Sequence, residues 1–248
     1  MLLQSEALVL LSRESGENDR LITALTKEYG LLRAFARGAK KNGSRLQSAS
    51  QMFCYGRFEF KRWKDALHVT DARPLTLFFG LHKSCERLAL AEYCSELATE
   101  LSPCEEPAPE QLRLLLNTLH YLSGGSRPLP MLKAIVELRL MCLAGYRPDL
   151  EGCRSCGAQH SPVFRLDYAQ GRLLCQTCLA DKKAPFPAQG TALAPQTLQA
   201  LRLLCEAPLE RAFRFAMPAQ GYIELTRVTE RYAAIQLGKR FKTLEYLD

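Results

Sequence analysis

Four of the ten cysteines form two Cys-x-x-Cys pairs, Cys153 with Cys156 and Cys175 with Cys178, and 18 residues separate the two pairs. Each tight Cys-x-x-Cys turn lets two thiolates reach one metal ion, and two such turns complete a tetrahedron with Zn–S bonds of about 2.3 Å. Gly157 follows the first pair and can adopt the positive φ that such a turn uses. Four thiolates close the ion to water, so the spacing predicts one structural Zn²⁺ ion rather than a catalytic one.

Two other readings of these cysteines are a redox dithiol and coincidence. A redox Cys-x-x-Cys needs only one pair, in a thioredoxin-like βαβ setting that this sequence lacks. His160 lies shortly after Cys156 and is a spare candidate ligand. The remaining six cysteines are scattered, and we expect small buried apolar side chains there: Cys54, Cys85, Cys94, Cys104, Cys142 and Cys205.

Nine basic residues lie between positions 33 and 64, where only Glu59 is acidic. They are Arg33, Arg37, Lys40, Lys41, Arg45, Arg57, Lys61, Arg62 and Lys64, and six aromatic residues alternate with them: Phe35, Phe53, Tyr55, Phe58, Phe60 and Trp63. On a barrel, lysine and arginine contact phosphates while exposed aromatic rings stack on bases. The pattern indicates nucleic-acid binding that tolerates many sequences and weakens with salt.

Part of this pattern has an ordinary structural explanation. Phe58 and Phe60 are expected in a core, and Trp63 is as compatible with packing in a loop as with stacking on a base. Basic residues on strands are often simply solvated. The segment 37–45 is better evidence, because it contains glycine, few apolar residues and only basic charges, and it predicts a mobile loop between two strands.

Charge and motifs narrow the class of protein. The chain has a net charge of +7, with +5 in residues 1–80, −2 in 81–150 and +4 in 151–248, which suggests a polyanionic partner for both ends, although ordinary charge variation is the alternative. It has no run of 18 apolar residues, and its first 19 residues do not resemble a signal peptide, so we expect a cytoplasmic protein without a membrane partner. No phosphate-binding, dinucleotide, serine-hydrolase or HExxH motif is present, so we expect no enzyme activity.

The spacing of apolar residues predicts an α+β protein of several domains. Strands are expected at 7–12, 21–26, 31–36, 52–61 and 67–70, and five short strands suit a closed OB-fold barrel. Residues 52–61 show the alternation of a half-buried strand. Helices are expected at 81–102, 112–122, 129–144, 192–206 and 222–247, the third in a core and the last broken at Gly238.

A hairpin of residues 163–168 and 172–174, turning at Gln170-Gly171, would bring the two Cys-x-x-Cys pairs together. The predicted division is a barrel at 1–78, a helical bundle made of 79–150 and 181–248, and a zinc-binding insert at 151–180.

The whole chain resembles the bacterial RecO family of recombinational repair proteins. The segments that carry the resemblance follow one another in order: Gly16–Leu21, Leu25–Gly30, Ala36–Lys41, Ser44-Arg45 and the Cys153–Gly157 turn. Some members of the family lack the cysteines, so this chain resembles the zinc-bearing form.

The resemblance implies an OB-fold followed by a helical domain with a zinc insert. It implies binding of single- and double-stranded DNA, annealing of complementary strands, and loading of RecA with RecR, in some organisms also RecF. The tail of the single-stranded-DNA-binding protein is a further implied partner. The DNA-binding candidates it gives are Arg37, Lys40, Lys41 and Arg45, with weaker candidates at Arg33, Arg57 and Lys61. Two alternatives stay open: an RNA-binding or ribosome-associated OB module, and a zinc enzyme such as a nuclease.

Overall fold

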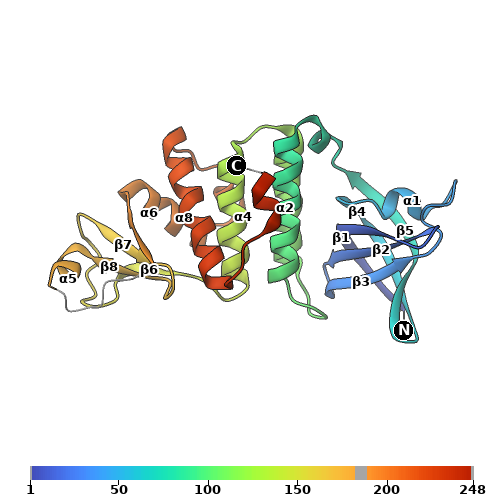
Figure 1. Ribbon diagram of the computed structural model, residues 1–248, viewed down its shortest axis with the longest axis horizontal. Helices are drawn as coiled ribbons and strands as arrows, with labels where there is room; N and C mark the ends of the chain where they lie inside the picture. Colours follow the sequence, from blue (N-terminus) through green and yellow to red (C-terminus); the bar gives the residue numbers. More distant parts are fainter. Residues whose placement is uncertain (1, 182–188, 247–248) are drawn as a thin grey trace. The chain divides into compact units, whose positions relative to one another are not determined.

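The computed structural model describes residues 2–181 and 189–246 and divides into two compact units (Figure 1). The first comprises Met1–Ser126 with Thr243–Asp248, and the second comprises Arg127–Lys242. The predicted domain boundaries at 78, 150 and 180 stay a prediction. Among the described residues, no helix is both long and apolar enough to cross a membrane.

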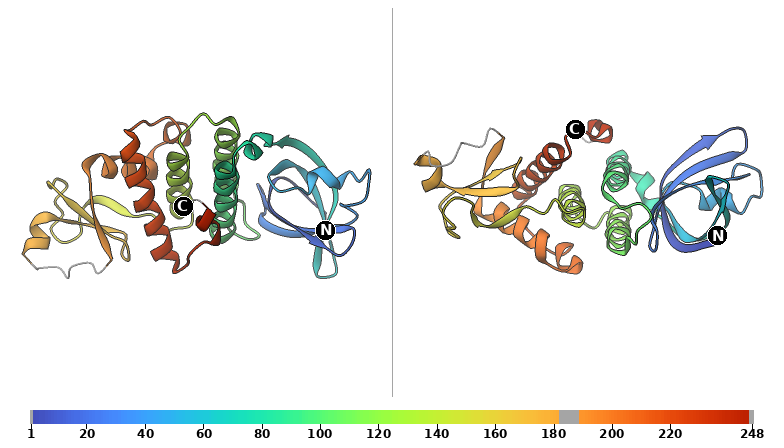
Figure 2. Two further views of the ribbon diagram at one scale, coloured as in Figure 1. Left: turned by 45° about the horizontal axis from the view of Figure 1, so that its top comes forward. Right: turned by 90° about the horizontal axis from the view of Figure 1, so that it is seen from below.

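The first unit begins with a closed five-stranded barrel, which confirms the OB-like fold expected from the sequence (Figures 1 and 2). Its strands are β1 (Leu2–Ser15), β2 (Asp19–Thr26), β3 (Gly30–Ala36), β4 (Cys54–Trp63) and β5 (Ala66–Leu77), and they close in the order β1-β2-β3-β5-β4. Only β3 and β5 pair in parallel. A short helix, α1 (Leu46–Ala49), follows the loop that connects β3 with β4.

Strand β4 shows why the barrel forms. Cys54, Gly56, Phe58 and Phe60 are buried while Arg57 and Lys61 are exposed, so the predicted period of two is confirmed. The rings of Phe58 and Phe60 stack inside with centroids 5.8 Å apart. These two phenylalanines therefore belong to the core.

Two strands are longer than the sequence pattern predicted. β1 starts at Leu2 and is bent by a register shift between Val9 and Leu11, and β5 runs to Leu77 with register shifts against β4. The added residues are partly polar, because one face of each strand meets water, so an apolar run alone underestimated their length.

Helices η1 (Phe79–Lys83), α2 (Cys85–Leu101) and α3 (Pro109–Gly124) follow the barrel in the first unit, which also takes in most of the 3-10 helix η2 near the C-terminus, and α2 and α3 pack against β1. The single helix predicted at 81–102 is divided, because the Ser84 side chain caps α2 by accepting a hydrogen bond from the Arg87 amide. The backbone joins barrel and helices directly, since the Leu31 amide donates to the Pro103 carbonyl over 2.8 Å.

The second unit is built around α4 (Leu129–Leu143), which packs against α6 (Pro195–Glu206) and α8 (Ala219–Leu237), with α7 (Leu209–Ala212) between them in sequence. α4 is buried on nearly all sides, as its apolar sequence predicted. α8 ends at Gly238, whose φ of 60° allows a left-handed cap, so the expected break is confirmed. The 3-10 helix η2 spans Lys242–Tyr246, and Leu247 of the predicted helix lies outside the described residues.

A four-stranded sheet carries the cysteines. It contains β6 (Asp149–Cys153), β7 (Phe164–Asp167), β8 (Arg172–Cys175) and β9 (Gly190–Leu193) in the order β6-β8-β7-β9, followed after β8 by α5 (Gln176–Ala180). The predicted hairpin is confirmed as β7 and β8. The helix predicted from residue 192 begins instead at Pro195, because residues 192 and 193 pair with β7 and proline favours the first turn of a helix.

Candidate metal centre and nucleic-acid interface

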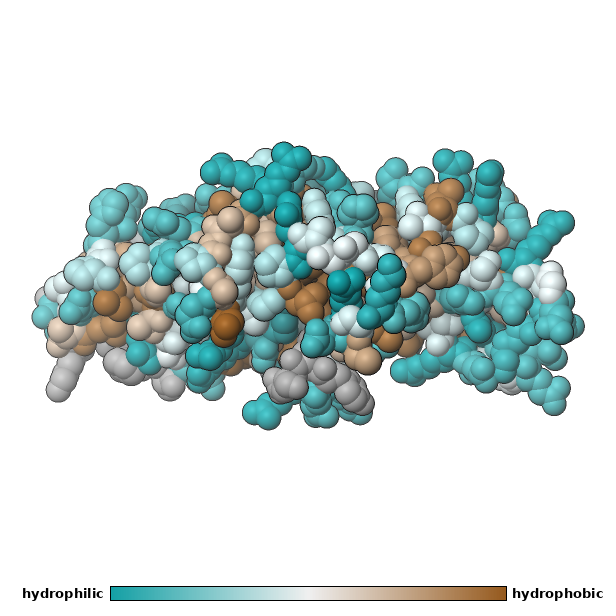
Figure 3. Space-filling model, turned by 90° about the horizontal axis from the view of Figure 1, so that it is seen from above, coloured by the Kyte–Doolittle hydropathy of each residue, from teal (hydrophilic) through white to brown (hydrophobic). Residues whose placement is uncertain are grey.

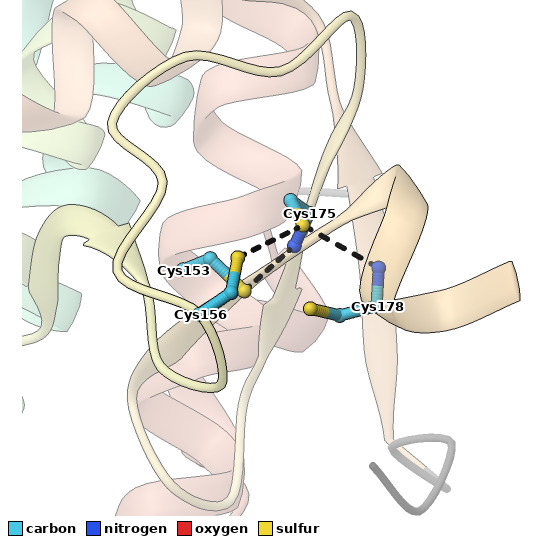
Figure 4. A group of neighbouring side chains, drawn as sticks. All are labelled: Cys153, Cys156, Cys175 and Cys178. Atoms are coloured by element: carbon cyan, nitrogen blue, oxygen red, sulfur yellow. Dashed lines mark hydrogen bonds between the residues drawn. The ribbon is translucent and has the colours of Figure 1, made fainter. Parts of the chain in front are cut away.

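The four predicted ligands converge at one place. The sulfur atoms of Cys153, Cys156, Cys175 and Cys178 all lie within 4.8 Å of one another, and the Cys156 and Cys175 sulfurs are 3.7 Å apart (Figure 4). Ligands at about 2.3 Å in a tetrahedron would place their sulfurs about 3.8 Å apart. The donor set and its spacing therefore fit one tetrahedral metal ion.

The local backbone explains why these sulfurs meet. Cys153 ends β6 and Cys175 ends the neighbouring β8, while Cys178 lies in α5. Gly157 adopts a φ of 75° and its amide donates to the Cys153 carbonyl over 2.8 Å, which closes the first turn as predicted. Backbone amides of Cys175 and Cys178 donate to the sulfurs of Cys153 and Cys175, respectively.

These hydrogen bonds prepare the cluster for a cation. Burial opposes ionisation of Cys153, but backbone amides, Cys175 foremost, outweigh it and lower the pKa of the Cys153 thiol to about 6. Hydrogen bonds with Cys156 and Cys175 raise the pKa of Cys178. The backbone amides thus favour one thiolate of the cluster, and a bound cation would favour all four.

An ion pair ties the first turn to the hairpin. Arg154, between the two cysteines of the first pair, lies 3.3 Å from the Asp167 carboxylate, and both side chains are largely buried. Among the described residues, the only group of three or more candidate ligands that could hold a metal is the cysteine cluster, so His160 is not one of its members.

The predicted nucleic-acid residues lie on the barrel and in one loop. Arg33 lies on the outer face of β3, and Arg37 comes directly after the end of that strand. Arg57 and Lys61 lie on the outer face of β4, and all four side chains are exposed. Lys40, Lys41 and Arg45 lie in the loop after β3, which the Lys40 amide ties to the β1–β2 turn by a 2.9 Å bond to the Asn18 carbonyl.

Ion pairs divide the basic residues into two groups. Lys40 pairs with Glu14 at 2.8 Å, Arg57 with Glu6 at 3.9 Å and Arg62 with Glu105 at 3.6 Å. Six others form no ion pair within the described part of the chain: Arg33, Arg37, Lys41, Arg45, Lys61 and Lys64. The uncompensated positive charge therefore lies mostly on β3, β4 and the segments that follow them.

Sequence reasoning underestimated one part of this surface. Trp63 is 55% exposed, with the Arg37 guanidinium 4.9 Å and the Lys64 ammonium 5.9 Å from its ring centroid. His68, which was not among the predicted residues, lies 5.8 Å from Trp63. In the sequence, His68 was marked only by its place in a short predicted strand. Its neighbours in space depend on strand pairing, so the sequence did not indicate that it belongs to this surface. Figure 3 shows that hydrophilic side chains cover much of the visible face, with apolar ones in separate groups.

Comparison with known proteins agrees with this architecture. A family model described as recombination protein O N terminal matches residues 1–78, and one described as recombination protein O C terminal matches residues 82–245.

Three relatives that match nearly the whole chain carry the same description. "DNA repair protein RecO" of Pelotomaculum thermopropionicum is 32% identical over 248 residues, covering 100% of this chain and 94% of the relative. Its counterparts in Desulforudis audaxviator and Bacillus subtilis are 33% and 28% identical, covering 98% and 100% of this chain and 95% and 94% of their own. Together with the two family models, these similarities show that the chain belongs to the RecO family of DNA repair proteins.

Proposed function

We propose that this protein binds single- and double-stranded DNA through its barrel and anneals complementary strands without consuming a nucleotide. Together with RecR, it would help RecA assemble on DNA covered by the single-stranded-DNA-binding protein. The observation that carries the proposal is the group of six basic residues without an ion pair in the described chain, found on a barrel of a DNA repair family. Since no described residue supplies these cations with a counterion, phosphates can serve as their partners.

The proposed mechanism is charge neutralisation. Two complementary strands repel each other through their phosphates, and cations bound along one strand reduce that repulsion. Arg37, Lys41 and Lys61 would contact phosphates while the bases stay available for pairing. No bond is made or broken in this process, which needs no catalytic residue.

The metal proposal is a single Zn²⁺ held by the four cysteines. A closed set of four sulfur ligands supports a structural role, and the strands that carry the ligands are only four or five residues long. Zinc would supply folding free energy to this sheet rather than activate water.

RecR, in some organisms RecF, and the acidic tail of the single-stranded-DNA-binding protein are proposed partners, and the cytoplasm, at the nucleoid, is the proposed location. Family membership supports these proposals.

The experiment that tests the function is an annealing assay with two complementary oligonucleotides, one labelled, in the absence of ATP. We expect the intact protein to accelerate duplex formation, and the double variant Lys41→Glu/Arg45→Glu to accelerate it much less. Equal acceleration by the variant, or none by the wild-type protein, would contradict the proposal. Repeating the assay with RNA strands tests the RNA-binding alternative, which predicts a preference for RNA.

A further inference from the structure

We infer that the outer face of β3, β5 and β4 holds a subsite for one unpaired nucleobase, which stacks on Trp63. The inference rests on the proposed binding of DNA and adds where a base, rather than a phosphate, is recognised. The site is a shallow cavity of about 360 Å³ lined by Arg37, Lys61, Trp63, His68, Val69 and Thr70. Its size falls in the range of small-ligand sites.

Strand pairing brings the rings together. Phe35 on β3 is opposite His68 on β5, and His68 is in turn opposite Lys61 on β4. Because facing residues in a sheet point to the same side, all three side chains share the outer face. The rings of Phe35 and His68 stack with centroids 5.7 Å apart and planes at 27°, and Trp63 tilts against His68 at 5.8 Å.

Trp63 is the exposed member of this group, at a position where a solvent-facing surface is normally polar. Trp63 remains 55% exposed even with Arg37 over its ring. An exposed indole held in place by neighbours is a low-entropy surface for stacking, and every base has a face that can stack on it.

His68 contributes a ring rather than a charge. Its Nδ1 is buried without a hydrogen-bond partner in the described chain, so stacking, not hydrogen bonding, holds the ring. Burial, with the nearby Arg37 charge, lowers the pKa of His68 although Asp19 opposes the shift. This shift favours the neutral imidazole over the charged one.

The surrounding charges indicate the class of ligand. Arg37, Lys61 and Lys64 flank the indole without an ion pair among the described residues, and no acidic residue lines the cavity. An apolar peptide or a lipid tail would leave these three cations unused. A nucleotide strand uses both features, because its base stacks on the ring while neighbouring phosphates meet the cations.

The subsite requires an unpaired base. In a duplex both faces of each base are occupied by neighbours in the stack, so Trp63 cannot reach one without unstacking it. The subsite therefore favours single-stranded over double-stranded DNA, while the loop cations attract both.

The chain has a single tryptophan, so fluorescence excited at the long-wavelength edge of the absorption band, where its nine tyrosines do not absorb, reports Trp63 alone. An oligothymidylate should quench this fluorescence as it binds. An abasic strand of the same length carries the same phosphates and should bind through charge with far less quenching. Anisotropy of a label on each strand measures binding independently of the tryptophan.

Variants complete the test. Trp63→Ala should weaken binding of oligothymidylate at least fivefold, by the usual contribution of one stacked base, and leave duplex affinity unchanged within about twofold. Trp63→Phe should restore part of the loss. Phe79→Ala removes a 71% exposed aromatic ring outside this face and should change neither affinity.

The outcomes separate the two proposals. Suppose that labelled oligothymidylate binds without quenching the wild-type fluorescence, and that Trp63→Ala binds it as tightly as the wild type does. The base subsite is then wrong and the DNA-binding function stands. Equal quenching by the abasic strand would also overturn the subsite, because a base would not be needed. If no strand binds at all, the proposed function itself fails.

Discussion

The Lys40 ammonium lies 2.8 Å from the Glu14 carboxylate, whereas Lys41, the next residue, forms no ion pair within the described chain. The hydrogen bond and the charge of Lys40 lower the pKa of Glu14, because both favour its ionised form. Two adjacent lysines of one loop therefore differ in the charge they can offer to a phosphate.

The first prediction follows from this difference. Lys41→Gln should weaken DNA binding more than Lys40→Gln, because Glu14 already compensates Lys40. Glu14→Gln should strengthen binding, since it releases Lys40. Titrations at several salt concentrations measure this, with each engaged cation contributing about −0.7 to the log–log slope on single strands. Equal losses for the two lysine variants would show that the ion pair does not matter for binding.

The second prediction concerns the metal. Purified protein should contain one zinc ion per chain, and Cys175→Ser should lose it, because three sulfurs leave an open and weaker site. Cys85→Ser is the matched control, since Cys85 is an exposed free thiol outside the cluster and its loss should leave the metal content unchanged. Metal analysis of the three proteins measures this.

Removing the ion should loosen the sheet that carries the cluster. A chelator is expected to raise amide hydrogen exchange in β7 and β8 while β1 and β4 of the barrel keep their protection. Metal-free protein with unchanged exchange in β7 and β8 would show that the ion is not structural.

The third prediction concerns a buried ion pair in the second unit. The Lys133 ammonium lies 2.8 Å from Glu137 and 2.5 Å from Glu230, and Thr229 also donates to Glu137. Lys133→Met should destabilise the protein by about 3–5 kcal/mol, because it leaves the Glu137 charge buried without its cation. Adding Glu137→Gln should recover much of that loss. Denaturant unfolding of both variants tests this, and a double variant no more stable than the single one would contradict it.

The same pair predicts a loss of stability in alkaline solution. Burial alone would lower the pKa of Lys133, but the charges and hydrogen bonds of Glu137 and Glu230 outweigh it and raise the pKa above its usual value. A raised pKa in the folded state stabilises the protein fully below the unfolded pKa of about 10.4, and this contribution disappears as the pH passes the folded pKa. The difference in stability between wild type and the double variant should therefore shrink above that pH.

The fourth prediction concerns the junction of the barrel with its helices. Gly30 has a φ of 58°, and an added Cβ would lie 2.2 Å from the Pro103 carbonyl oxygen. Gly30→Ala should cost more than about 2 kcal/mol, through both the left-handed backbone and the overlap. Gly16 has a similar φ of 72° with nothing within 4 Å of such a Cβ, so Gly16→Ala should show the smaller backbone cost alone. Thermal unfolding compares the two, and equal losses would exclude a role for the close contact.

The sequence predicted those elements whose residues carry a recognisable spacing within a short stretch of chain. Alternation identified β4, and the spacing of cysteines identified a cluster whose ligands come from two turns. β7 and β8 are equally short but were found from the Gln170-Gly171 turn between them, whereas β6 and β9 have no such turn and are ordered by pairing with β8 and β7. No periodicity develops over so few residues.

The same limit applies to the candidate interface. The basic loop was visible as a run of like charges, but compensation of Lys40 by Glu14 depends on the contact of that loop with the β1–β2 turn. The place of His68 beside Phe35 depends on the parallel pairing of β3 with β5. Such relationships between distant residues follow from the tertiary structure and leave no pattern in neighbouring positions.

The most direct test of this account is the affinity of the intact protein for a labelled single-stranded oligonucleotide, measured by anisotropy over a series of salt concentrations. If the six uncompensated cations each meet a phosphate, the log–log slope should approach about −4, and Arg37→Glu/Lys41→Glu should make it shallower. Undetectable binding in dilute buffer, or an affinity indifferent to salt, would contradict the claim that this barrel binds DNA through its basic face.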